Sequence, residues 1–171
     1  LCVAWYAMQH HIDAVVYYDD TSALGLKILR RFAPNIKRVI DISAASRLYM
    51  KKIYERDMNI RPDFSQLLER EIGDWMHSKK RMKRLRQEIQ LADWYLVPSD
   101  FVAESLREFG VKNERMLHCP YGVDIKMFSS KVYDTIDKYC NHPLRCIYVG
   151  GVKQIKGIAY LLDAFLEISP S

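Results

Sequence analysis

The feature that most constrains the fold is a regular alternation of short apolar runs with amphipathic segments. In the amphipathic segments, apolar residues recur at three- and four-residue steps, which indicates helices that bury one face. Alternation of this kind predicts an α/β fold, a doubly wound parallel sheet with right-handed crossovers. The apolar runs are rich in β-branched and aromatic residues, as expected of buried strands, and lie at 12–19, 37–43, 93–99, 114–120 and 144–150.

The composition is that of a globular protein. Of its 171 residues, 49% are apolar and 27% are charged, which excludes a disordered chain, and no apolar run is long enough for a transmembrane helix. The net charge of +5 suits an anionic ligand, a nucleic acid or an acidic membrane surface. The four cysteines form no C-x-x-C pair, so we expect reduced thiols in a cytoplasmic protein and no metal site.

A glycine turn followed by a lysine separates the last predicted strand from the last predicted helix. Gly150 and Gly151 end the strand, and Lys156 begins the helix expected at 156–168. A glycine turn lets the backbone approach a ligand, and the N–H groups that begin a helix attract a phosphate. Neither Walker A nor G-x-G-x-x-G spacing is present. Taken alone, the stretch is therefore either a phosphate cradle or an ordinary βα corner.

A basic segment lies in the middle of the chain. Six of the eight residues from 79 to 86 are Lys or Arg, and Met82 and Leu85 would face inward on a helix. One interpretation is a solvated basic face. The other is a peripheral contact with an anionic membrane, in which each basic residue contributes ~1 kcal/mol. No recognised nucleic-acid-binding module surrounds the segment, so we expect no nucleic-acid partner.

Three motifs in the second half of the chain follow one another in a fixed order. Residues 92–106 read A-D-x4-P-S-x-F-x3-S-L, residues 122–128 read G-V-D-x3-F, and residues 150–165 read G-x5-K-G-x3-L-L-x-A-F. Together they resemble the nucleotide-sugar glycosyltransferases of the GT-B type, in particular the large retaining family 4. The resemblance is specific over 92–168 and weaker before it.

The resemblance implies two Rossmann-like domains that face a cleft, of which this chain carries a fragment. Residues 1–120 would form the latter part of the N-terminal, acceptor-side domain. Residues 121–143 would be the interdomain linker, and residues 144–171 the first βα unit of the C-terminal, donor-binding domain. The fragment alone is expected to be inactive, because the family's acidic E-x7-E stretch does not occur in it.

The resemblance also implies a donor site. In the family, the lysine at the position of Lys156 contacts the diphosphate of a UDP-, GDP- or ADP-sugar, and the glycine turn of Gly150 lies beside it. Positive groups stabilise the departing diphosphate, and the sugar is transferred with retention, without a metal or other cofactor. Many members carry arginine where this chain has Gly151, so one contact is missing or comes from Lys153.

Candidate acceptor-side residues follow two predicted strands. Asp19, Asp20 and Ser99 come at strand carboxyl ends, where parallel α/β sheets bind ligands. The two aspartates could orient a hydroxyl of a carbohydrate, lipid or small-molecule acceptor, although helix capping explains them equally well. No residue can be assigned as catalytic. The alternative function is a non-catalytic α/β binding module that recruits a partner or an anionic membrane through residues 79–86, in the cytoplasm or at the membrane periphery.

Overall fold

The structure, a computed structural model, describes residues 2–128 and 145–168. The chain divides into two compact units, Leu1–Pro120 and Tyr121–Ser171, and each is considered by itself. Most of the expected linker at 121–143, from residue 129 onward, lies outside the described residues. None of the helices that the structure describes has the length and apolarity needed to cross a bilayer.

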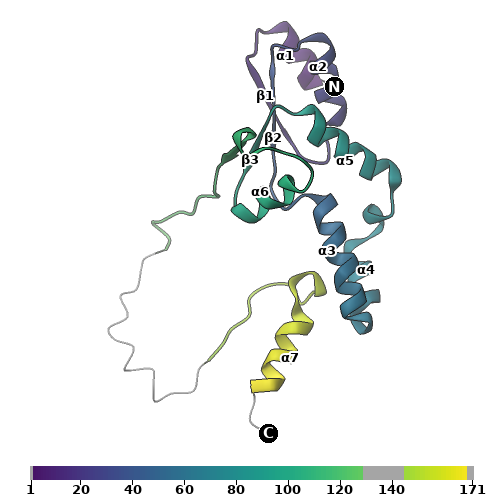
Figure 1. The fold of residues 1–171 in the computed structure, drawn as a ribbon. Coiled ribbons are helices and arrows are strands. Elements are labelled where there is room, and N and C mark those ends of the chain that lie inside the picture. The colour runs from purple at the N-terminus through teal and green to yellow at the C-terminus, as the bar shows by residue number, and fades with distance from the viewer. Residues whose placement is uncertain (1, 129–144, 169–171) are drawn as a thin grey trace. The chain divides into compact units, whose positions relative to one another are not determined.

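The first unit alternates helices and strands, as the sequence pattern predicts (Figure 1). Three one-turn 3₁₀ segments, Pro62–Phe64, Asp74–Met76 and Asn113–Arg115, join some of these elements. The main elements are α1 (Cys2–Gln9), β1 (Ala14–Tyr18), α2 (Ala23–Phe32), β2 (Lys37–Asp41), α3 (Arg47–Ile60), α4 (Ser65–Ile72), α5 (Lys79–Leu91), β3 (Trp94–Val97), α6 (Asp100–Arg107) and β4 (Met116–His118).

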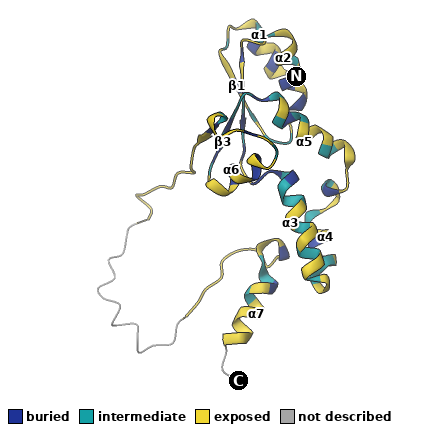
Figure 2. Ribbon diagram, viewed as in Figure 1, coloured by how far each residue is buried: buried dark blue, intermediate teal, exposed yellow. Residues whose placement is uncertain are grey.

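The four strands form one parallel sheet in the order β1-β2-β3-β4. This arrangement confirms the α/β class and the parallel sheet, and it is compatible with a Rossmann-like fold. The sheet packs its buried face against α2, α5 and α6 (Figure 2). Tyr95 and Leu106 are fully buried there. On the opposite face, Val16 and Tyr18 of the edge strand β1 stay 57% and 71% exposed.

The second unit differs from the sequence prediction in two respects. The described residues of the strand expected at 144–150 form no strand, and Ile147 is 88% exposed. A strand requires a neighbour for its N–H and C=O groups, and no described residue of this unit pairs with it. The helix expected at 156–168 is α7 (Ile158–Ile168), which begins later because Gly157 adopts a left-handed conformation with φ of 72°.

Candidate functional site

A small pocket with a mostly apolar lining and a few polar side chains lies near the carboxyl ends of β1 and β2. Its polar lining comes from Asp19 after β1, from Ser46 and Arg47 at the start of α3, and from Glu88 of α5. The apolar part of the lining includes Ile40 and Leu106. The cavity volume of about 20 Å³ is room for about one water-sized group. The pocket therefore fits a single hydroxyl better than a whole sugar.

Asp20 is a structural anchor and not a ligand-facing acid. The Arg81 guanidinium donates to both of its carboxylate oxygens, with Nε to Oδ1 at 3.1 Å, and Arg47 Nε lies 3.5 Å from Oδ2. Burial would raise the pKa of Asp20, but the hydrogen bond and charge of Arg81, with the charge of Arg47, lower it below its ordinary value. Asp20 is therefore ionised and already paired.

Asp19 differs from its neighbour in environment. It lines the pocket, and its backbone N–H donates to Asp41 O at 3.3 Å, which continues the pairing of β1 with β2. Burial raises the pKa of Asp19 above its ordinary value, although the charge of Arg47 acts against this shift. A partly buried carboxyl of this kind beside a cation is suited to orienting a hydroxyl. Of the two predicted aspartates, Asp19 is the one placed to meet a ligand.

Ser99 has a structural role. It is the N-cap of α6, and its Oγ accepts a hydrogen bond from the backbone N–H of Val102 at 3.4 Å. Residues that line the pocket do not include it. Ser99 therefore does not share the pocket with Asp19, and helix capping explains the serine of this motif.

Glu88 was not singled out in the sequence, yet it lies at the centre of this region. It is 3% exposed, and its carboxylate accepts hydrogen bonds from the backbone N–H groups of Asp20, Ser22 and Ala23 at 2.7–2.9 Å. Burial raises its pKa, and these N–H groups partly offset that shift. The sequence signal that could have found it is one acid on the inward face of a basic helix.

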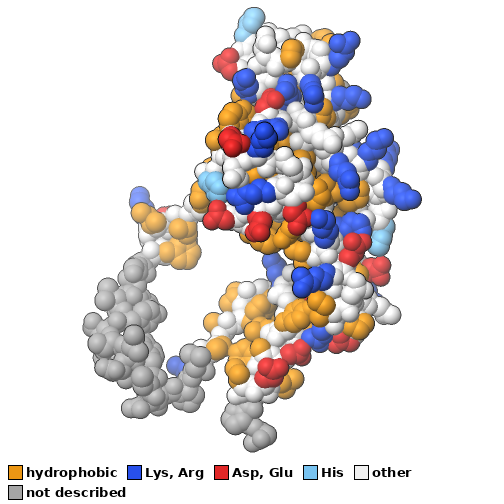
Figure 3. All heavy atoms as spheres, in the orientation of Figure 1, with side chains coloured by type: hydrophobic (Ala, Val, Ile, Leu, Met, Phe, Trp, Pro, Cys, Tyr) orange, Lys and Arg blue, Asp and Glu red, His pale blue; other side chains and the backbone are white. Residues whose placement is uncertain are grey.

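The basic residues from 79 to 86 do different things. Arg81 pairs with Asp20 in the turn after β1, whereas Lys79, Lys83 and Arg86 follow one stripe of α5 at steps of four and three residues. These three line a surface groove with Met76 and Met82, together with His77 and with Lys51 of α3. Figure 3 shows Lys and Arg side chains gathered on the side of the first unit where α5 lies.

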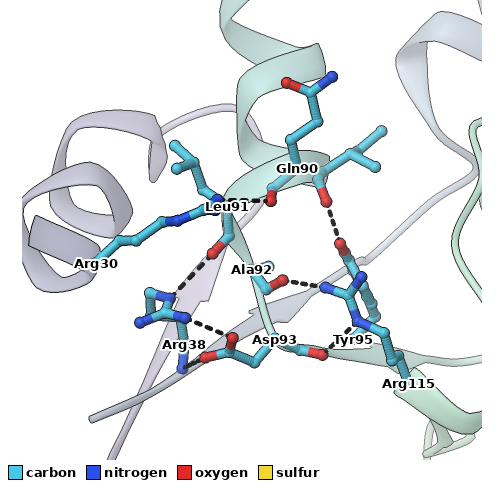
Figure 4. A network of polar contacts seen from close by, with 9 residues as sticks. Arg30, Arg38, Gln90, Leu91, Ala92, Asp93, Tyr95 and Arg115 are labelled. Atoms are coloured by element: carbon cyan, nitrogen blue, oxygen red, sulfur yellow. Dashed lines mark hydrogen bonds and ion pairs between the residues drawn. The ribbon is translucent and has the colours of Figure 1, made fainter. Parts of the chain in front are cut away.

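A second polar network, at the amino ends of the strands, explains part of the first motif (Figure 4). Asp93 Oδ1 and Oδ2 accept from the side chain and backbone N–H of Arg38, at 2.5 and 2.9 Å. Arg38 Nε also donates to Leu91 O at 3.0 Å, and Arg115 Nε donates to Asp93 O at 2.8 Å. The network joins the end of α5 to β2 and β3. Asp93 thus has a structural role.

The glycine turn of the second unit presents two lysines. Gly150 has a φ of 155°, and a Cβ built there would lie 3.2 Å from Tyr148 Oη. Lys153 and Lys156 are both exposed. The prediction placed Lys156 in the first turn of a helix; it instead ends the 3₁₀ turn Gln154–Lys156, before Gly157 and α7. The four predicted donor-site residues, Gly150, Gly151, Lys153 and Lys156, all lie in this one short segment before α7.

Gln154 is a residue of this turn that the sequence interpretation missed. It is 3% exposed, and its side-chain Oε1 accepts a hydrogen bond from Ala159 N at 3.3 Å. One N–H group near the start of α7, which the phosphate-cradle interpretation left for an anion, is therefore already satisfied by the protein. The lysine side chains, more than the helix terminus, are the groups that can meet a diphosphate here.

Within residues 2–128 and 145–168, no group of three or more His, Cys, Asp or Glu side chains could hold a metal ion. Comparison with protein-family models, with curated proteins and with solved structures gave no match. The features of the chain that bear on its function are therefore the site residues and the three sequence motifs.

Proposed function

We propose that the protein belongs to a glycosyltransferase system of the GT-B type, which transfers a sugar from a nucleoside-diphosphate sugar to a hydroxyl acceptor, with retention. The observation that carries the proposal is the turn from Gly150 to Lys156. It combines a backbone conformation that L side chains rarely adopt, at Gly150, with two exposed lysines, Lys153 and Lys156. Gly150 and Lys156 are also the first glycine and the lysine of the last of the three ordered motifs.

The chemistry that these residues support is electrostatic. As the bond between the sugar and the diphosphate breaks, negative charge grows on the diphosphate oxygens, and lysine ammonium groups stabilise it more strongly than in the bound donor. A charge-assisted hydrogen bond of this type contributes roughly 1.5–3 kcal/mol. On the acceptor side, the Asp19 carboxyl accepts a hydrogen bond from the attacking hydroxyl, in a pocket that fits one such group.

The proposal is tested with a panel of donors. Saturation-transfer NMR of the protein with UDP-, GDP- and ADP-glucose should show transfer to the base and ribose protons of one donor. The matching free nucleoside diphosphate should displace that donor, and the monophosphate should do so much less, because the recognised group is the diphosphate. Absence of transfer to all three donors would contradict the proposal.

The basic groove on α5 supports a second candidate function, recruitment to an anionic membrane. Lys79, Lys83 and Arg86 are exposed, and the ion pairs within the described part of the chain include none of them. Such cations are available to lipid phosphates, at ~1 kcal/mol each near the surface. Arg81 is excluded from this set because it holds Asp20.

Vesicle sedimentation tests the second candidate. Vesicles that contain phosphatidylserine should bind the protein, and phosphatidylcholine vesicles should not. The double variant Lys79→Glu/Lys83→Glu should weaken binding by about 30-fold or more. The control Lys37→Glu/Lys112→Glu changes the net charge equally, at exposed positions outside α5. Equal loss in both variants would mean that total charge, and not the groove, attracts the vesicles.

A further inference from the structure

Glu88 is a buried acid that has no cation as its partner among the residues that the structure describes. The ion pairs of the described residues do not include it. Its Oε1 accepts from Ser22 N at 2.7 Å and Ala23 N at 2.9 Å, and its Oε2 accepts from Asp20 N at 2.8 Å. Two of the donors lie in the turn between β1 and α2 and the third, Ala23, is the first residue of α2, all more than 60 residues earlier in the sequence.

The turn that Glu88 holds has no local cap of its own. Ser22 is the N-cap of α2, but its side chain makes no capping hydrogen bond, and the first turn of α2 has no acidic residue. Asp20 adopts a left-handed conformation with φ of 68°, which non-glycine residues sustain only where the surroundings fix it. The carboxylate of Glu88 therefore supplies from α5 the acceptors that a local cap usually provides.

Residues along one face of α5 contact the turn at two places. Arg81, Leu85 and Glu88 recur at steps of four and three residues, so they lie on one face of the helix. Arg81 binds the Asp20 side chain, Leu85 is buried against the pocket, and Glu88 binds the turn backbone. Arg81 and Glu88 together therefore hold both a side chain and the backbone of the segment that follows Asp19.

We propose that Glu88 is a positioning residue, whose carboxylate fixes the β1–α2 turn and thereby directs the Asp19 carboxyl into the pocket beside Arg47. Asp19 immediately precedes the clamped residues, and Asp19, Arg47 and Glu88 all line that pocket. The inference rests on the proposed function only in taking Asp19 as the group that meets the acceptor. The same contacts bear on phosphate binding. Because the N–H groups of Ser22 and Ala23 at the start of α2 already donate to Glu88, we do not expect this turn to bind the donor's phosphates.

Two variants distinguish the contribution of the Glu88 side-chain length from that of its negative charge; the contacts of Glu88 with the turn are called the clamp below. Glu88→Asp keeps the negative charge but shortens the side chain, and Glu88→Gln keeps the length but removes the charge. Hydrogen exchange of the Asp20, Ser22 and Ala23 amides should become at least about 10-fold faster in both variants. The amides of β3 should exchange at the wild-type rate, which shows that the core stays folded. Unchanged exchange at the turn in both variants would overturn the inference.

The pKa of Asp19 tests the positioning role directly, because it should not change if Glu88 only stabilises the fold. Asp20, Asp41 and Arg47 are the charged groups that act on Asp19, and all three are retained in the variants. Carbon-13 NMR should show the pKa of Asp19 falling toward its ordinary value in Glu88→Asp, because a released turn exposes the carboxyl to water. The control Glu104→Gln, at an exposed acid on α6, should leave it unchanged. An unchanged Asp19 titration in Glu88→Asp would refute the positioning role.

These two readouts require neither donor nor acceptor. If they give the expected results while the donor panel fails, the glycosyltransferase proposal is wrong and the clamp is correct. If the donor panel succeeds while turn exchange and Asp19 titration stay unchanged, the clamp is wrong and the proposed function stands.

Discussion

Replacing Asp93 with alanine is expected to lower the free energy of unfolding by about 3 kcal/mol, the low end of the range for breaking a buried ion pair. The variant leaves the Arg38 guanidinium, whose side chain is 10% exposed, without its carboxylate. It also removes the acceptor of the Arg38 backbone N–H, at the start of β2. We expect a loss at the low end of that range because the Asp93 side chain is 30% exposed, so water partly screens the ion pair.

Urea unfolding followed by tryptophan fluorescence measures this loss. The matched control is Arg30→Ala, because Arg30 belongs to the same network but is exposed and makes one side-chain hydrogen bond, to Gln90 O at 3.3 Å. Its loss should cost less than about 1 kcal/mol. Similar costs for Asp93→Ala and Arg30→Ala would show that the Arg38–Asp93 pair is not the stabilising element of the network.

The second large effect concerns Lys156. We expect Lys156→Ala to weaken binding of the preferred nucleoside diphosphate by about 10-fold or more, since a charge-assisted hydrogen bond contributes roughly 1.5–3 kcal/mol. Lys153→Ala should have a smaller effect if Lys153 only supplements the site. The matched control is Lys126→Ala, which removes the same charge from another exposed position in the second unit.

Gly151 allows the opposite change to be tested at the same site. A Cβ built at Gly151 would meet only the Lys153 side chain, at 3.6 Å or more, which is ordinary contact. Gly151→Arg is therefore expected to fold and to tighten diphosphate binding by about 10-fold. Gly150 offers no such position, because its φ of 155° strains any side chain.

The sequence predicts the sheet well because local pattern and pairing agree there. The runs at 12–19, 37–43, 93–99 and 114–120 contain β1, β2, β3 and β4. The run at 144–150 has the same composition, but its described residues, 145–150, form no strand, because strand formation depends on a partner as well as on β propensity. A separate case is the end of α4: the helix stops at Gly73, which has a positive φ of 71°, and α5 begins after it.

The site is less predictable because its contacts span long distances in the sequence. Asp19 and Asp20 are adjacent and equivalent in the sequence, and contacts with distant residues distinguish them, chiefly the pairing of Asp20 with Arg81, 61 residues away. Glu88 has no local signature beyond its place on the inward face of α5. Lys156 is a candidate because its neighbours form a motif, but its position before α7 depends on the left-handed Gly157, which the helical pattern did not reveal.

The most direct test of the proposed function is titration calorimetry with the nucleoside diphosphate selected by the donor panel. The wild-type chain should bind it, Lys156→Ala should bind about 10-fold more weakly or worse, and Lys126→Ala should bind as the wild type does. Circular dichroism should first show that the variants keep the wild-type fold. Equal affinity of the wild type and Lys156→Ala would contradict the diphosphate-binding role of this turn.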